Sequence, residues 1–333
     1  MRPPRFWSAP PGHPAARLLA PLGAAYGALT AARMDRPGIA APCPVLCVGN
    51  FTLGGAGKTP TALALADLLR EAGLRPAFLS RGYGGRLPGP VRVAPERHRA
   101  EEVGDEPLLL ARAAPTVVAR DRPAGARLCA GLGADVIVMD DGLQNPSLLK
   151  DRALAVVDAQ VGLGNGLPFP AGPLRVPLAR QWPHVTGLVL IGEGAAGAAV
   201  AAEAQARGLP VHRARLEPDA PDAFAGRRVF AFAGIGRPEK FFGTLAAAGA
   251  EIVGRRPFPD HHPFRQAELA SLAEAAARAG AALVTTEKDA LRLPPGFRER
   301  VAVLAVRLRF EDRQALHAQL AGLSGWRKSA ASP

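Results

Sequence analysis

The sequence predicts an α/β protein with a doubly wound parallel sheet, a second, smaller α/β domain and an N-terminal amphipathic helix. Short runs that are apolar on both faces alternate with helix-like segments, which is typical of parallel sheets covered on each side. A glycine-rich stretch at residues 50–60 joins one such run directly to a helix-like segment. The chain has 333 residues, of which 48% are hydrophobic, enough for about two domains with buried cores.

The first series of elements is expected between residues 37 and 222. Its strands are predicted at 44–50, 75–84, 115–119, 134–142, 154–159 and 186–192, and its helices at 59–73, 104–114 and 122–133. Gly73 closes the first of these helices, and Asp105 and Glu106 open the second, where acidic residues favour a helix start. Cys43 and Cys47 lie in the apolar run at the first strand and are interpreted as buried strand residues.

A second series begins near residue 223. Strands are predicted at 227–236, 250–258, 281–289 and 300–310, with helices at 238–248 and 266–279 and a last helix after residue 310. We therefore expect three parts, which are an N-terminal helix region at 1–36, a larger domain at 37–222 and a smaller domain at 223–333.

The N-terminal region combines apolar spacing with positive charge. Leu18, Leu22, Tyr26 and Leu29 recur at helical spacing. Arginines surround them, with Asp35 as the one acid before residue 67, which suits a helix on an anionic membrane surface with Phe6 and Trp7 as anchors. The alternative is an amphipathic helix packed on the protein's own core. The uncharged stretch is shorter than the roughly 20 residues that a spanning helix needs, and no signal-peptide cleavage site follows it.

Composition narrows the class of partner. The formal net charge of +12 favours an anionic partner, which could be a nucleic acid, an acidic membrane or a phosphorylated substrate. Aromatic residues are only 5%, and no basic stripe or nucleic-acid-binding module is visible, which counts against nucleic acid. The three cysteines have no metal-binding spacing, and such sparse use fits a reducing cytoplasm.

The stretch NFTLGGAGKTP at residues 50–60 resembles a phosphate-binding P-loop. The pattern G-x-x-x-x-G-K-[ST] fits Gly57, Lys58 and Thr59, but it has Thr52 where the first glycine belongs, so we expect Gly49 to serve the turn instead. Glycine backbone N–H groups and the following helix N-terminus would bind phosphate oxygens, with Lys58 on the β- and γ-phosphates and Thr59 on Mg²⁺. The residues expected to contact the nucleotide are Thr52, Leu53, Gly54, Gly55, Ala56, Gly57, Lys58 and Thr59. The alternative is a glycine-rich turn with an incidental lysine.

Two acids end the apolar run VIVMDDG. In P-loop proteins an aspartate at this position holds Mg²⁺, and adjacent carboxylates repel each other unless a cation lies near them. Asp140 and Asp141 are therefore predicted at the metal. The alternative is a pair of acids starting a surface turn before Gly142.

Three further stretches carry chemistry. Asp105 in VGDEP either caps a helix or orients an attacking hydroxyl. Asp260, His261 and His262 in FPDHHPF are compatible with a metal site, an acid–base histidine or a surface turn. The stretch TTEKD at 285–289 follows an apolar strand and is a candidate phosphate-contacting loop.

Taken in order, these motifs are specific enough to identify a family. GGAGKTP, SRGYG, GDEP, DDGLQNPSL, GNGLPFPAGPLR, FAGIGRPEKFF, FPDHHPF and TTEKDA together resemble the tetraacyldisaccharide 4'-kinases of lipid A biosynthesis, over about residues 5–322. The resemblance implies phosphorylation of the 4'-hydroxyl of an acylated glucosamine disaccharide 1-phosphate by ATP and Mg²⁺, at the cytoplasmic face of the inner membrane, with no obligate protein partner evident. The family also has threonine at the position of Thr52.

The resemblance implies roles for individual residues. Asp105 would act as the base, supported by His261, and Asp140 and Asp141 would lie at the metal and nucleotide. Further contacts to ATP or substrate are expected from Arg122, Gln144 and Arg175. Two positions depart from the family pattern: Val176 replaces a glutamate after AGPLR, and Leu143 replaces a phenylalanine in DDGFQ. If that glutamate helps to bind Mg²⁺, another residue or water must substitute for it here.

The sequence thus favours in-line phosphoryl transfer in a site that closes between two domains. A nucleotide-driven switch protein is one rival, but such proteins commonly carry a lysine where this chain has Leu53. A nucleic-acid-binding NTPase is the other, and it is suggested by charge alone.

Overall fold

The computed structural model describes residues 4–10 and 12–323. Its larger sheet has nine strands in the order β13-β8-β7-β6-β1-β5-β2-β4-β3. The strands are β1 Val45–Gly49, β2 Pro76–Ser80, β3 Val91–Arg92, β4 Thr116–Val118, β5 Val136–Asp140, β6 Arg152–Asp158, β7 Gly187–Ile191, β8 Val211–Pro218 and β13 Val306–Phe310. Only the edge strands β3 and β13 run antiparallel to their neighbours, which confirms the predicted parallel sheet.

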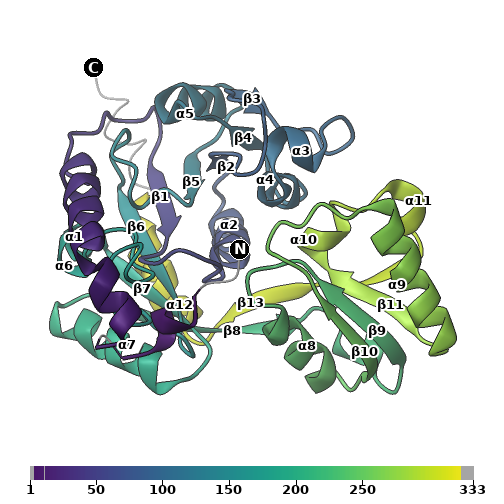
Figure 1. Cartoon of the computed structure of the whole chain (residues 1–333). Helices are drawn as coiled ribbons and strands as arrows, with labels where there is room; N and C mark the ends of the chain where they lie inside the picture. The colour runs from purple at the N-terminus through teal and green to yellow at the C-terminus, as the bar shows by residue number, and fades with distance from the viewer. Residues whose placement is uncertain (1–3, 11, 324–333) are drawn as a thin grey trace.

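Helices cover both faces of this sheet (Figure 1). One apolar core includes residues of α1 (Pro14–Met34), α5 (Arg122–Gly131) and α7 (Ala195–Ala206). The core on the opposite face includes residues of α2 (Lys58–Glu71), α4 (Asp105–Leu110) and α12 (Arg313–Leu320). The larger unit is therefore doubly wound, as predicted. Short helices α3 (Ala100–Val103) and α6 (Leu178–Gln181) lie in its connections, with 3₁₀ turns at Arg5–Ser8, Trp182–His184, Pro221–Phe224 and Ala321–Leu323.

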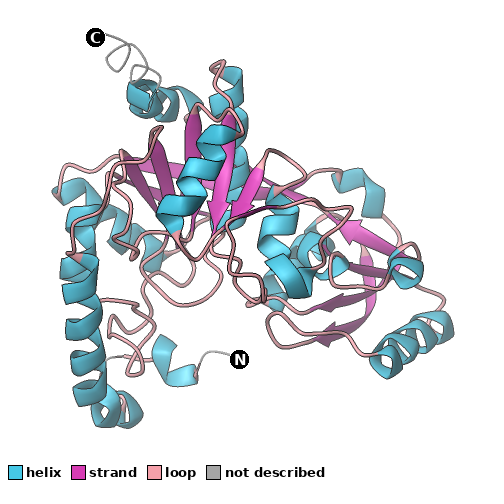
Figure 2. Ribbon diagram, turned by 90° about the horizontal axis from the view of Figure 1, so that it is seen from above, coloured by secondary structure: helices cyan, strands magenta, loops and turns pink. Residues whose placement is uncertain are grey.

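The smaller unit is a four-stranded parallel sheet in the order β10-β9-β11-β12. Its strands are β9 Arg228–Ala233, β10 Glu251–Pro257, β11 Ala282–Thr286 and β12 Val301–Leu304. Helix α8 (Pro238–Ala247) packs in the core on one face and α9 (Gln266–Arg278) in the core on the other, while α10 (Glu287–Ala290) and α11 (Pro295–Arg298) are short. Figures 1 and 2 show the two sheets side by side as separate bodies.

After β12 the chain returns to the larger unit. The smaller unit is therefore shorter than the expected range of 223–333. The single strand predicted at 300–310 is in fact two: β12 pairs with β11, and β13 pairs with β8 of the larger sheet. Leu316 and Leu320 of α12 are buried in the core of the larger unit. The first half of the 300–310 run is apolar, and the second half alternates apolar residues with Arg307 and Arg309. Both patterns are typical of a strand, so hydrophobic patterning alone did not reveal the break at Ala305. Residues 306–323 therefore belong with the larger sheet.

The N-terminal helix α1 packs through its smallest residues. Ala16, Gly23, Gly27, Ala31 and Met34 are buried, and a Cβ atom at Gly23 would lie 2.9 Å from the Pro168 carbonyl oxygen. The close approach of α1 to the body therefore depends on glycine.

Three leucines of α1 face the other way. Leu18, Leu22 and Leu29 are 80%, 61% and 75% exposed. Helix α1 is thus packed on the protein, but not through the apolar stripe, as the alternative of packing on the core would have required. Within the described residues, no helix combines the length and hydrophobicity that crossing a bilayer requires.

All three cysteines are buried. Cys47 lies in β1 as expected, whereas Cys43 lies just before the strand begins.

Candidate active site

The phosphate-loop candidate follows β1 and ends at the start of α2. Gly54 and Gly57 have φ angles of 104° and 92°, a region that glycine adopts without strain. Lys58 is the first residue of α2 and is 9% exposed, with its Nζ 3.3 Å from Asn50 Oδ1. The strand, the turn and the helix start thus have the arrangement by which P-loops bind phosphate.

The backbone around Thr52 explains why glycine is not needed there. Thr52 forms an isolated antiparallel bridge with Leu174, and Leu53 N donates to Pro173 O over 2.7 Å. Among the described residues, the non-glycine residues with positive φ are Asp141 and His261, so Thr52 has an ordinary backbone conformation. Gly49 has a different role from the one expected, because a Cβ atom there would lie 2.4 Å from Leu143 Cβ. It is required by close packing and not by the turn.

The two acids at the end of β5 have different environments. Asp140 is 1% exposed, and neither of its carboxylate oxygens has a hydrogen-bond partner among the described residues. Burial, aided by the charge of Glu106, raises the pKa of Asp140 to about 7. Asp141 Oδ2 lies 2.9 Å from Arg175 NH2 and 3.7 Å from Lys58 Nζ. Burial raises the pKa of Asp141, but Lys58 and Arg175 outweigh that effect and hold it below its ordinary value.

Two predicted contact residues adjoin these acids. Arg122 begins α5, is 2% exposed and donates from NH1 to Ala119 O over 3.2 Å. Burial lowers the pKa of Arg122 to about 10, although Asp140 and Asp141 oppose the shift. Arg175 donates from Nε to Thr52 O over 2.9 Å, and so joins the AGPLR segment to the phosphate loop.

Gln144 is held by the protein itself. Its Nε2 donates to Asn50 O at 2.7 Å and to Gln181 Oε1 at 2.8 Å, which braces the segment before the phosphate loop. Its predicted contact with ATP or substrate stays a prediction. Val176, at the position of the family's glutamate, is buried in the apolar core, so no carboxylate is supplied from that position.

The structure brings Asp105 and His261 together from the two units. His261 Nδ1 lies 3.1 Å from Asp105 Oδ2, and Arg292 Nε lies 3.4 Å from the same oxygen. Burial raises the pKa of Asp105, but the hydrogen bond to His261 and the charges of Lys288 and Arg292 outweigh it and set the pKa at about 2. The same hydrogen bond raises the pKa of His261. Sequence position gives no hint of this pairing, because the two residues are far apart in the chain.

A second ion pair beside it was missed at the sequence level. Lys288 Nζ lies 2.5 Å from Glu106 Oε1. Glu106 also interacts electrostatically with Lys58 and Asp140. The cluster around Asp105 and Glu106 therefore adjoins the phosphate-loop candidate. The sequence feature that could have indicated this pair is the position of TTEKD, which contains Lys288, at the end of an apolar strand. His262, by contrast, pairs with Glu268 at 2.9 Å within the smaller unit.

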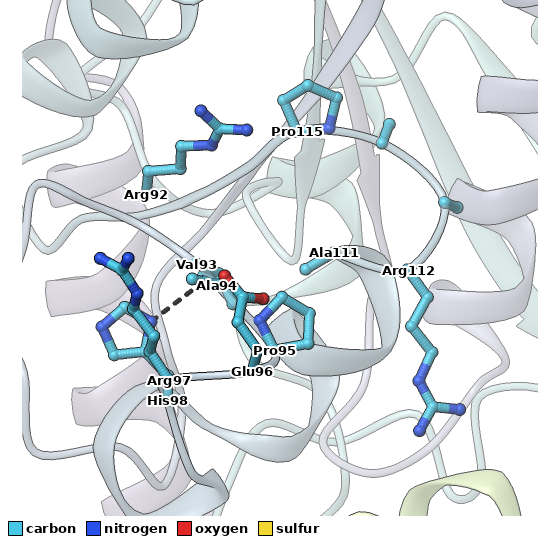
Figure 3. Close-up of a pocket in the computed structure, with 12 residues that line it drawn as sticks. Arg92, Val93, Ala94, Pro95, Glu96, Arg97, His98, Ala111, Arg112 and Pro115 are labelled. Carbon is cyan, nitrogen blue, oxygen red and sulfur yellow. Dashed lines mark hydrogen bonds between the residues drawn. The ribbon is translucent and has the colours of Figure 1, made fainter.

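A separate hollow of about 750 Å³ lies between residues 92–98 and 111–115 (Figure 3). Its lining ends at Pro115, just before β4, whereas Arg122 follows the carboxyl end of that strand. The hollow therefore lies at the amino end of β4, toward the opposite end of the sheet from Arg122 and the phosphate loop. Figure 3 shows the Arg92 and Arg112 side chains pointing in different directions, without a common focus. None of the predicted site residues lines it.

Comparison with known proteins gives a consistent result. The family model described as LpxK, Tetraacyldisaccharide-1-P 4'-kinase, matches residues 15–324. The "Tetraacyldisaccharide 4'-kinase" of Methylorubrum populi is 74% identical over 321 residues, which are 96% of this chain and 98% of the relative. That of Methylobacterium radiotolerans is 72% identical over 325 residues, covering 98% and 99% of the two chains.

A solved structure matches as well. The crystal structure of LpxK from Aquifex aeolicus in complex with ATP has a TM-score of 0.72 and 25% identity, over 92% of this chain and 99% of that one.

Proposed function

This chain belongs to the tetraacyldisaccharide 4'-kinase family, and from that premise we propose how its own residues carry out the reaction. The enzyme transfers the γ-phosphate of ATP to the 4'-hydroxyl of a tetraacyldisaccharide 1-phosphate, a step of lipid A biosynthesis. The observation that supports the assignment of roles is the Asp105–His261 pair, whose two residues come from different units.

The nucleotide side is assigned to residues 52–59, with Lys58 on the β- and γ-phosphates. Both carboxylate oxygens of Asp140, and Oδ1 of Asp141, are buried and have no hydrogen-bond partner among the described residues. Such oxygens are suited to binding a cation. Asp140, Asp141 and Thr59 would hold Mg²⁺, which supplies neutralising charge to the phosphates when bound. Within the described residues no group of three or more His, Cys, Asp or Glu could hold a metal ion by itself, so the phosphates and water would complete its coordination.

The acceptor side is assigned to Asp105. A carboxylate with a pKa of about 2 is a weak base, so its contribution is to orient the sugar hydroxyl and to take its proton late in the transfer. His261, from the smaller unit, holds Asp105 Oδ2 through Nδ1 and thereby fixes the carboxylate. Because Asp105 and His261 come from different units, closure would complete the site and exclude water that could hydrolyse ATP.

The test of this function is transfer of label from γ-³²P-ATP to a purified tetraacyldisaccharide 1-phosphate. We expect one labelled lipid product, with phosphate at the 4'-position and little free phosphate. ATP hydrolysis without lipid labelling, stimulated by a protein or by DNA, would instead support a nucleotide-driven switch or a nucleic-acid-dependent NTPase.

Membrane attachment is the second part of the proposal. Leu18, Leu22 and Leu29 form one exposed line along α1, and the neighbouring Arg17 and Arg33 are exposed too. Trp7 and Tyr26 pack edge-on against Phe169, which is 38% exposed, so that aromatic rings adjoin the same helix. Apolar and basic side chains in this arrangement suit a peripheral helix on an anionic surface, here the cytoplasmic face of the inner membrane.

Replacing Leu18, Leu22 and Leu29 together by serine is expected to lower binding to anionic phospholipid vesicles at least tenfold. The reason is that each fully buried leucine contributes about 1.5–3 kcal/mol of transfer free energy. Vesicle sedimentation measures the effect. The matched control replaces the exposed Ala25, Ala28 and Ala32 of the same helix by serine and should stay within about threefold of the native protein. Equal binding of the leucine variant would refute the assigned membrane contact.

A further inference from the structure

A buried acid outside the assigned catalytic groups connects the two units. Asp158 is the last residue of β6, the strand beside β1 in the larger sheet, and it is 7% exposed. Its Oδ1 accepts a hydrogen bond from Gln160 N over 3.1 Å, so its own turn fixes the carboxylate. The second oxygen, Oδ2, is left to face the smaller unit.

Two cations of the smaller unit meet that oxygen. Arg237 NH1 lies 2.5 Å from Asp158 Oδ2, and Lys240 Nζ lies 2.9 Å from it. Arg237 NH2 also donates to Gln160 Oε1 over 3.0 Å. Burial raises the pKa of Asp158, but Lys240 and Arg237 outweigh that effect and lower it. The carboxylate is therefore charged at neutral pH and shared by two cations from the other unit.

The segment that carries these cations lies against the phosphate loop. It connects β9 to α8, and Arg237 directly precedes the helix. A Cβ atom at Gly236 would be 3.6 Å from Gly55 N and 3.3 Å from Asp260 Oδ2. Gly236 thus lies between the phosphate loop and the segment that bears His261. The position of Arg237 consequently sets how closely the smaller unit covers the nucleotide side.

Among the described residues, two ionic clusters join the units near the site, and Arg307 of β13 also pairs with Glu287 of α10 at 3.4 Å where the chain crosses back to the larger unit. One joins Asp105 and Glu106 to His261, Arg292 and Lys288 and contains the proposed catalytic groups. The other joins Asp158 to Arg237 and Lys240 and contains none of them. Substitution at Asp158 therefore alters the attachment of the smaller unit without removing a group assigned to the chemistry.

We propose that Asp158 is a positioning residue that holds the smaller unit closed over the phosphate loop during phosphoryl transfer. The inference rests on the proposed function of the site. Without the carboxylate, Arg237 and Lys240 lose their shared partner and repel each other across the former contact. The closed arrangement becomes less populated, and the second-order rate constant falls in proportion because only closed molecules contain the complete site.

The experiment compares the full-length protein with Asp158→Asn by two measurements. Spin labels on cysteines introduced at the exposed Ala198 of α7 and Ala247 of α8 report the distance between the units, and the native cysteines are buried. With a non-hydrolysable ATP analogue we expect one narrow distance distribution for the parent and a broader, longer one for Asp158→Asn. We expect kcat/KM for the lipid substrate to fall at least tenfold, with partial recovery in Asp158→Glu.

The matched control is Asp135→Asn, which breaks an ion pair with Arg75 at 2.9 Å inside the larger unit. It should leave distances unchanged and kcat/KM within about twofold. Unchanged distances in Asp158→Asn would overturn the proposal, whatever the kinetics. If the parent protein transfers no phosphate to the lipid while Asp158→Asn still widens the distance distribution, the assigned reaction fails and the closing contact stands.

Discussion

Replacing Asp105 by asparagine is expected to slow phosphate transfer by about 10²–10⁴-fold while ATP affinity stays unchanged. The substitution keeps the size of the side chain but removes the charge that, in the role proposed for Asp105, orients the acceptor hydroxyl and receives its proton. Asp105 is 3% exposed and is bound by groups of the smaller unit, so little water can replace its carboxylate. Single-turnover transfer measured by rapid quench gives the chemical rate, and calorimetric titration with a non-hydrolysable ATP analogue gives the affinity.

The control for Asp105→Asn must account for the position of Asp105 at a helix start, where its Oδ1 accepts from Glu106 N over 2.9 Å. Asp312→Asn serves this purpose, because exposed Asp312 caps α12 by accepting from Ala315 N over 2.9 Å. That variant should transfer phosphate at the native rate. Native turnover by Asp105→Asn would rule out the role assigned to Asp105.

Replacing Lys58 by alanine is expected to lower kcat/KM at least 10²–10³-fold, about the loss seen when one preorganised charge-stabilising group is removed. Lys58 is nearly buried, and Asn50 and Asp141 hold its ammonium group at the start of α2. Unlike Asp105→Asn, this variant should also bind ATP more weakly, since the Lys58 ammonium group is proposed to contact the phosphates before and during transfer. Lys58→Arg should not restore the rate, because the larger planar group does not fit a site made for a compact charge.

Steady-state kinetics and nucleotide titration together measure the effect at Lys58. Arg70→Ala is the control on the same helix, since Arg70 is exposed and pairs with Asp67 at 2.5 Å. It should change neither constant by more than about twofold. If Lys58→Ala bound ATP and transferred phosphate normally, residues 52–59 would not be the phosphate-binding loop.

Some parts of the site could be predicted from the sequence because their residues are close together in the chain. The strand β1, the glycine turn and α2 follow one another, so spacing alone places Lys58 at a helix start. Asp140 follows from the apolar run of β5, since the carboxyl ends of neighbouring parallel strands lie at the same edge of a sheet. These inferences needed no knowledge of the tertiary fold.

Other parts depend on long-range packing that sequence patterns do not encode. The pairing of Asp105 with His261 was suggested by family resemblance, and patterning predicted neither that pair nor the one between Glu106 and Lys288. Helix α7 was not predicted, because its alanine-rich residues show no contrast between a buried and an exposed face. The exposure of Leu18 agrees with the expected surface helix, but the glycines that let the opposite face of α1 approach the body were not predicted.

We propose that Asp105 and His261 act together in the reaction, although they come from the two separate units of the protein. The measurement that tests it most directly is a double-mutant cycle with Asp105→Asn and His261→Asn, read as single-turnover transfer rates. We expect the double variant to be no slower than Asp105→Asn alone, because His261 contributes through that carboxylate. Rate losses that multiply, with each substitution acting independently of the other, would contradict the account.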